Sequence, residues 1–231
     1  MRPIPALVPE HLGRSTGRVR PETCLSSLDI LDDQDLLCLL LDPVLEGPDA
    51  RTIAADLLER FGGLGEIASA DVPELLRVAG TGPSVILQLK LLRQLSVRLA
   101  RCAAHCRPVL SSWDALRTYA ITALAHLPRE QFRALYLDRR NILLRDEQVA
   151  DGSVDHAPVY PREVIRRALE VSASALILIH NHPSGDPTPS QADITITRQI
   201  VDAARVFNLQ VHDHLVVGRE GTASFRALGL M

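Results

Sequence analysis

Residues 175–193 read ALILIHNHPSGDPTPSQAD and decide the fold of the C-terminal half of the chain. The first five are apolar, and a short apolar run bounded by polar, proline-rich sequence predicts a buried β-strand. Ser190 predicts the N-cap of a helix reaching about Phe207, because its side-chain oxygen can accept a hydrogen bond from the first turn. The stretch therefore predicts a strand, a sharp loop and a helix, with polar side chains concentrated where the strand ends.

Two histidines separated by one residue stand at the end of this predicted strand. His180 and His182 project to the same side, so one cation can accept both imidazoles. Asp193, on the first turn of the next helix, can supply a carboxylate oxygen to the same cation. Three N/O ligands leave one tetrahedral position open for water, which is typical of catalytic rather than structural zinc. The sequence therefore predicts one zinc ion per chain that activates water for hydrolysis.

Ser190 lies in the same loop and admits two interpretations. At a helix N-terminus its hydroxyl can donate a hydrogen bond to the oxyanion of a tetrahedral intermediate. The spacing from Ser190 to Asp193 also fits a helix-capping pattern, and the prolines of the loop can simply shape it. We expect the catalytic role and keep the structural one as its alternative.

The sequence on either side predicts two kinds of architecture. Residues 26–101 show helical periodicity, and their longest predicted helix, 84–101, has leucines at every fourth position: Leu87, Leu91, Leu95 and Leu99. After Trp113 strands alternate with helices, including a hairpin formed by residues 132–138 and 142–149. We therefore expect a poorly ordered tail at 1–23, a helical domain at 24–107 and an α/β domain at 108–231.

Composition excludes several classes of protein. A net charge of −3 over 231 residues is not the strongly basic balance of a nucleic-acid binder. Apolar runs such as 171–179 are far shorter than the ~20 residues needed to cross a bilayer. Residues 1–21 lack the apolar stretch of a signal peptide. We expect a cytoplasmic protein without membrane contact.

Gly80-Thr81-Gly82 separates two predicted helices and resembles a helix-hairpin-helix element. The backbone amides of such an element can hold a nucleic-acid phosphate without reading bases. Here Pro83 removes one amide, and residues 84–86 lack the lysine that would strengthen a phosphate contact. Weak DNA binding through Gly80 and Gly82 is one interpretation, and protein docking or simple packing are the others.

The spacing His-x-His, seven residues, Ser, two residues, Asp resembles the JAMM signature of the JAB/MPN metallopeptidase superfamily. The longer string from His180 to Ser190 resembles the RadC family in particular, as do VYPREV at 159–164 and DHLVVG at 213–218. The resemblance extends from about residue 24 to the C-terminus. It implies a JAB-type α/β domain, a curved sheet flanked by helices, in which His180, His182 and Asp193 bind zinc.

The resemblance also implies a general acid/base. Glu147, within DEQVADGS at 146–153, matches the position where RadC-like chains carry a glutamate before a Gly-Thr or Gly-Ser pair. Glu163 is its competitor, although Arg162 or Arg166 can pair with Glu163 for purely structural reasons. We expect Glu147 to move the proton.

Residues 212–214 contribute a further alternative. Successive strand residues face opposite sides of a sheet, so Asp213 and the two histidines beside it cannot all point into the site. One of them can serve as an outer hydrogen-bond partner of a metal-binding histidine. A simple role at the strand end is the other interpretation.

We expect peptide or isopeptide hydrolysis of an unknown peptide or protein-conjugate substrate, with Glu147 moving the proton and Ser190 stabilising the oxyanion. The alternative is a DNA-associated, repair-related module or a metal-dependent nuclease. Nucleases commonly use paired metals bridged by carboxylates, whereas this sequence offers one His/His/Asp set. An inactive scaffold would have lost ligands, and a deaminase would need His-x-Glu and Pro-Cys-x-x-Cys, which are absent from the sequence.

Overall fold

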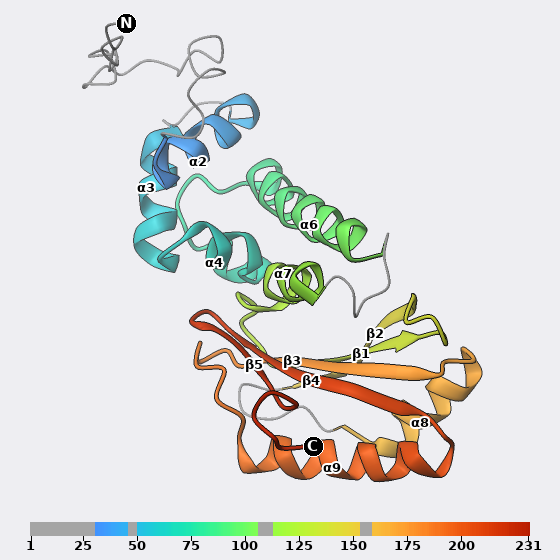
Figure 1. Ribbon diagram of the computed structural model, residues 1–231. Coiled ribbons are helices and arrows are strands. Elements are labelled where there is room, and N and C mark those ends of the chain that lie inside the picture. The colour runs from blue at the N-terminus through green and yellow to red at the C-terminus, as the bar shows by residue number, and fades with distance from the viewer. Residues whose placement is uncertain (1–30, 46–49, 106–112, 153–158) are drawn as a thin grey trace, which may run out of the picture.

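The computed structural model describes residues 31–45, 50–105, 113–152 and 159–231. These residues form a helical unit followed by a five-stranded sheet with helices on both faces (Figure 1). The predicted tail at 1–23 and the predicted boundary between residues 107 and 108 lie outside the described residues. An all-α region preceding a mixed α/β unit confirms the predicted fold class.

The helical unit consists of short helices and one long helix around an apolar centre. Its elements are α2 (Asp33–Leu41), η3 (Asp42–Val44), α3 (Ala50–Phe61), α4 (Leu64–Ser69), α5 (Val72–Leu75) and α6 (Pro83–His105). Its buried side chains include Leu37, Ile53, Leu57, Ile67 and Leu89. Full burial of one aliphatic side chain contributes about 1.5–3 kcal/mol, so this cluster holds the unit together.

The long predicted helix exists as α6, but its regularly spaced leucines do not face the core. Leu87, Leu91, Leu95 and Leu99 are 60%, 47%, 58% and 72% exposed. The side of α6 that packs inward carries Val85 and Leu89 instead. The periodicity therefore identified the helix without identifying its buried side.

The hairpin between α5 and α6 is held together by its own backbone. Gly80 has a φ of 83°, a left-handed conformation that favours glycine. The N–H of Thr81 donates to the Val78 carbonyl at 3.2 Å, and the N–H of Gly82 donates to the Gly80 carbonyl at 3.1 Å. Two amides of the hairpin are thus engaged within it.

The α/β unit is a sheet with the strand order β2-β1-β3-β4-β5. Its elements are α7 (Trp113–Leu124), β1 (Gln131–Leu137), β2 (Leu143–Asp151), α8 (Pro161–Glu170), β3 (Ala175–Asn181), α9 (Gln191–Val206), β4 (Gln210–Gly218) and β5 (Gly221–Ser224). Only β3 and β4 run parallel among these strands, with α9 as their crossover. The predicted strand, loop and helix at 175–193 are therefore confirmed.

β3 is the buried centre of the sheet, with every residue covered. Ile177 and Ile179 pack in the cluster that α7 covers. Leu176 and Leu178 pack in the cluster beneath α8 and α9 on the opposite face. Because side chains alternate along a strand, the next residue on the α8 and α9 face is His180. In Figure 1, α9 runs along that face while α7 lies on the other.

Candidate metal centre

The end of β3 and the start of α9 bring three polar side chains together. The Nε2 atoms of His180 and His182 lie 3.0 Å apart. Asp193 Oδ1 is 3.3 Å from His180 Nε2, and Asp193 Oδ2 is 3.4 Å from His182 Nε2. His180 is fully buried, whereas the side chain of His182 is 18% exposed. The three residues predicted as ligands therefore converge at a place with access to solvent.

The chemistry of these atoms fits a cation. His182 Nδ1 lies 2.9 Å from the carbonyl oxygen of Asp186, which can only accept, so Nδ1 carries the proton and Nε2 presents a lone pair. That lone pair meets a second imidazole nitrogen and a carboxylate. Ligand atoms 2.0–2.1 Å from a tetrahedral zinc ion stand about 3.3 Å apart. The observed separations match that spacing, and the residues fit a metal ion with N/O ligands.

Asp193 is held as a carboxylate. Burial by itself raises its pKa, but the neighbouring imidazoles of His180 and His182 and the hydroxyl of Ser190 outweigh burial and hold the pKa well below its ordinary value. The same carboxylate raises the pKa of His182, and the Asp186 carbonyl acts in the same direction. Asp193 therefore carries the negative charge needed to bind a cation at neutral pH.

Ser190 caps α9 and orients Asp193 at the same time. Its N–H and its hydroxyl donate to Asp193 Oδ2 at 2.7 Å and 2.6 Å, and its oxygen accepts from the Asp193 N–H at 3.2 Å. The structure thus contains the capping interaction between Ser190 and Asp193 that the sequence offered as the alternative. A hydroxyl has one proton, so donating to an oxyanion requires it to turn away from Asp193.

Glu147 forms an ion pair away from the three ligands. Its two oxygens accept from Arg167 Nη2 at 2.5 Å and from Arg167 Nε at 2.7 Å. The hydrogen bond from Arg167 lowers the pKa of Glu147, which weakens it as a base. Among the described residues, the cluster able to share an ion contains both histidines and Asp193 but not Glu147.

Glu163 is also an ion-pair residue. Its oxygens lie 3.0 Å from Arg166 and 3.6 Å from Arg162. These are the structural partners proposed from the sequence. Neither glutamate singled out there is brought to the histidines by the contacts of the described residues.

A third glutamate, which the sequence reasoning missed, lies beside His182. In the antiparallel pairing of β1 with β3, Phe132 is opposite His180. Continuing this register by two residues sets Glu130 opposite His182, on the same side of the sheet. Its charge contributes to raising the pKa of His182. Glu130 is partly exposed, so its carboxylate is accessible to water.

Asn181, between the two histidines, fixes the backbone around Glu130. Its Oδ1 accepts from the N–H of Gln131 at 2.8 Å, and its Nδ2 donates to the carbonyl of Arg129 at 3.1 Å. The carbonyl of Glu130 itself accepts from the N–H of Gly152 at 2.8 Å. The sequence signal was an acidic residue directly before β1, but its meaning depends on the register between β1 and β3.

A β-bulge in β4 decides which residue of 212–214 reaches the site. Ile177 pairs with Asp213 and Leu178 with His214, while His212 is the extra residue. His214 is fully buried, and its Nε2 lies 2.8 Å from His180 Nδ1. Asp213 instead accepts from Ser224 Oγ at 2.5 Å and from the Arg226 N–H at 3.0 Å. His214, and not Asp213, therefore contacts a candidate metal-binding histidine, as expected for an outer hydrogen-bond partner.

Comparison with known proteins places the chain in a family. A family model described as a RadC-like JAB domain matches residues 110–230. A UPF0758 protein from Rhodobacter capsulatus is 53% identical over 203 residues, covering 88% of this chain and 95% of its own. A UPF0758 protein from Ruegeria pomeroyi is 46% identical over 224 residues, covering 97% of this chain and 100% of its own. The chain belongs to the RadC family.

Membership of the RadC family agrees with the resemblance seen in the sequence, and the JAB domain of that family places the chain in the JAB/MPN superfamily. The matched region, 110–230, contains the three converging side chains, Glu130 and His214. In this RadC-family chain none of the described helices is long and apolar enough to cross a membrane.

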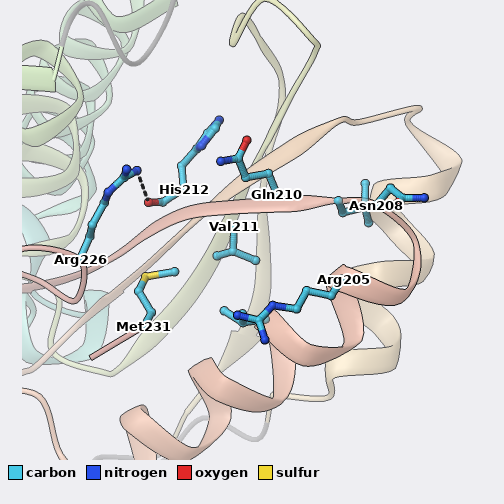
Figure 2. A pocket seen from close by; sticks show the side chains of 9 residues that line it. Arg205, Asn208, Gln210, Val211, His212, Arg226 and Met231 are labelled. Carbon is cyan, nitrogen blue, oxygen red and sulfur yellow. Dashed lines mark hydrogen bonds between the residues drawn. The ribbon is translucent and has the colours of Figure 1, made fainter. Parts of the chain in front are cut away.

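A separate pocket of about 560 Å³ lies at the other end of β4 (Figure 2). It is bordered by Arg205, Gln210 and Arg226. Figure 2 shows His212 and Val211 extending from opposite sides of the strand. His180 pairs with Val216, near the far end of β4, so this pocket is not the RadC candidate metal site.

Proposed function

We propose that this RadC-family chain is a zinc-dependent hydrolase of the JAMM type that cleaves peptide or isopeptide bonds. The observation that carries the proposal is the convergence of two imidazole nitrogens and one carboxylate. His180, His182 and Asp193 would hold one zinc ion. Zinc in such a site supplies Lewis acidity, which lowers the pKa of bound water to about 7.

We further propose Glu130 as the residue that moves the proton. It stands across from His182 in the extended register, and Asn181 holds the backbone on both sides of it. A carboxylate there can accept a proton from the attacking water and return it to the leaving nitrogen. Glu147, the glutamate expected from the sequence, is the competing candidate, but Arg167 engages both of its oxygens.

Ser190 has one role that the contacts support and one that remains a prediction. Through Asp193 it orients a ligand carboxylate. Its predicted contact with an oxyanion requires its hydroxyl to rotate when substrate arrives. Ser190→Ala would remove both roles, so zinc affinity should fall, and a loss of turnover that persists when the variant is saturated with zinc is the result expected from the oxyanion role.

The first experiment tests the metal. Elemental analysis of the purified parent chain should find about one zinc per chain, and a His180→Ala/His182→Ala double variant should lose it. Stoichiometric zinc that persists in the double variant would contradict the assignment. Thermal unfolding of both proteins without metal shows whether the variant is folded.

The second experiment identifies the substrate class and the base together. Glu130→Gln and Glu147→Gln variants, both loaded with zinc, are compared with the parent as traps for bound molecules. We expect peptides or protein conjugates to accumulate on Glu130→Gln only. Accumulation on Glu147→Gln instead would restore the glutamate expected from the sequence, and accumulation of nucleic acid would favour the alternative function.

The DNA-associated alternative has less support. The N–H groups of Thr81 and Gly82 donate within the hairpin, which leaves fewer amides for a phosphate. The net charge of −3 adds no general attraction for a polyanion. DNA binding at low salt that is lost in a Gly80→Ala/Gly82→Ala variant would favour this alternative.

A further inference from the structure

We propose that Thr197 and His214 are positioning residues that fix the tautomer of His180, so that its Nε2 lone pair faces the metal position. The inference rests on the metal site of the proposed function. It follows from the directions of three buried hydrogen bonds, which donor and acceptor chemistry determines one after another.

The first direction is set at Thr197 on α9. Its Oγ1 lies 2.6 Å from the backbone carbonyl oxygen of Asp193 and 2.6 Å from His214 Nδ1. A carbonyl oxygen can only accept, so the single hydroxyl proton points to Asp193. Towards His214 the Thr197 oxygen must therefore accept, and His214 carries its proton on Nδ1.

The second direction follows at His214. This residue is 0% exposed and packed between the rings of Phe132 and Phe225. A second proton would make its imidazole a buried cation and is therefore disfavoured. With one proton on Nδ1, its Nε2 is an acceptor, and it accepts from His180 Nδ1 at 2.8 Å.

The third direction is the consequence for His180. Because its Nδ1 donates to His214, its Nε2 has no proton and presents a lone pair. That lone pair lies 3.3 Å from Asp193 Oδ1. The chain of hydrogen bonds thus begins at the backbone carbonyl of Asp193 and ends at His180, whose unprotonated Nε2 faces the carboxylate of the same Asp193.

The rings of His180 and His214 pack against two phenylalanines. Phe225 stacks on His214 with ring centroids 4.6 Å apart, and Phe132 stacks on His180 at 5.9 Å. His182, by contrast, has its tautomer set directly by one backbone carbonyl, that of Asp186. Of these two histidines, His180 is the one that depends on a hydroxyl two hydrogen bonds away, which makes Thr197 the informative position.

The test compares two threonines of the same helix. Thr195 makes the same kind of bond as Thr197, from Oγ1 to the carbonyl of Gln191 at 2.8 Å, but on the exposed side of α9. Thr197→Val keeps the side-chain shape and removes the hydroxyl, and Thr195→Val is the matched control. We expect zinc affinity, measured by competition with a chromogenic chelator, to fall about 10- to 100-fold in Thr197→Val only.

Two further measurements separate positioning from general damage. Thr197→Ser retains the hydroxyl and should restore zinc affinity to nearly that of the parent. Nitrogen-15 spectra of the imidazoles in the metal-free proteins should show His180 protonated on Nδ1 in the parent and as a tautomer mixture in Thr197→Val. This second readout needs neither zinc nor turnover.

The outcomes are distinguishable. A parent that binds no zinc would defeat the proposed function itself. A parent that binds zinc, with Thr197→Val binding equally well and showing the same His180 tautomer, would overturn this inference alone. Equal losses in Thr197→Val and Thr195→Val would also overturn it, because helix damage would then explain both.

Discussion

Gly218, the last residue of β4, allows the loop after His182 to lie directly against the sheet. A Cβ atom at this position would stand 2.0 Å from the carbonyl oxygen of Gly185, 2.7 Å from its carbonyl carbon and 3.0 Å from the nitrogen of Pro187. These are backbone atoms, which cannot rotate away as the end of a side chain can. Gly218→Ala therefore forces the loop to move.

The size of that movement follows from the contact distances. Ordinary van der Waals contact with a Cβ begins at 3.4 Å, so the Gly185 oxygen must retreat by about 1.4 Å, the difference between 3.4 and 2.0 Å. The next residue, Asp186, supplies the carbonyl that holds His182 Nδ1 at 2.9 Å. A shift of this size breaks a hydrogen bond whose useful range is about 2.7–3.2 Å. We expect zinc affinity to fall about 10- to 100-fold, as it does when such an outer partner is lost.

The assay is a zinc competition titration of Gly218→Ala, the parent and Gly82→Ala. Gly82 has nothing within 4 Å of its would-be Cβ, so Gly82→Ala introduces the same methyl group without a clash. Overpacking should also lower the free energy of unfolding of Gly218→Ala by about 1–3 kcal/mol. Parent-like zinc affinity and unfolding in Gly218→Ala would refute the reasoning.

Three further predictions concern the glutamates and the ligands. Zinc-loaded Glu130→Gln should keep its zinc and lose turnover on any substrate that trapping identifies, whereas Glu147→Gln should retain turnover; the reverse pattern would return the base to Glu147. Glu147→Gln should lower the free energy of unfolding by only about 0–1 kcal/mol at pH 7, because its partly exposed pair with Arg167 is screened by solvent. Since the folded-state pKa of Glu147 is lowered from 4.5, this contribution is present above pH 4.5 and lost as the pH falls through the folded value, so denaturant unfolding of parent and variant should converge once the pH lies below that folded value. Asp193→Asn should abolish stoichiometric zinc in elemental analysis, and full zinc occupancy in a folded Asp193→Asn protein would remove Asp193 from the ligand set.

The convergence of the three candidate ligands could be predicted from the sequence because these residues are close together along the chain. His180, His182 and Asp193 lie on one strand, one loop and the first turn of one helix. Local rules about strand alternation and helix capping are enough to direct such residues to one point. The mixed α/β fold was predictable for a similar reason, since each element has its own apolar pattern.

Residues contributed by distant elements could not be predicted in the same way. Glu130 reaches His182 only through the register of β1 on β3, and a shift by one residue would turn it to the other face. His214 reaches His180 because His212 forms a bulge that changes the alternation of β4. Nothing in the local sequence specifies either the register or the bulge.

The leucines of α6 illustrate a different limit. Their spacing predicts a helix correctly, but periodicity states only that apolar residues share a side. In the part of the chain that the structure describes, Val85 and Leu89 pack inward and Leu95 and Leu99 face outward. Which side is covered depends on the neighbouring helices and not on α6 itself.

Asn181 gives the middle position of His-x-His a structural role. The residue between the histidines offers one acceptor to Gln131 and one donor to Arg129, at a reach that suits a short amide. An aspartate would direct a second acceptor at the Arg129 carbonyl, and a glutamine would be one methylene too long. A sequence pattern that allows any residue at this position therefore also accepts chains without the two hydrogen bonds that join β3 to the segment containing Glu130. Requiring asparagine there would select for the complete arrangement rather than for the ligands alone.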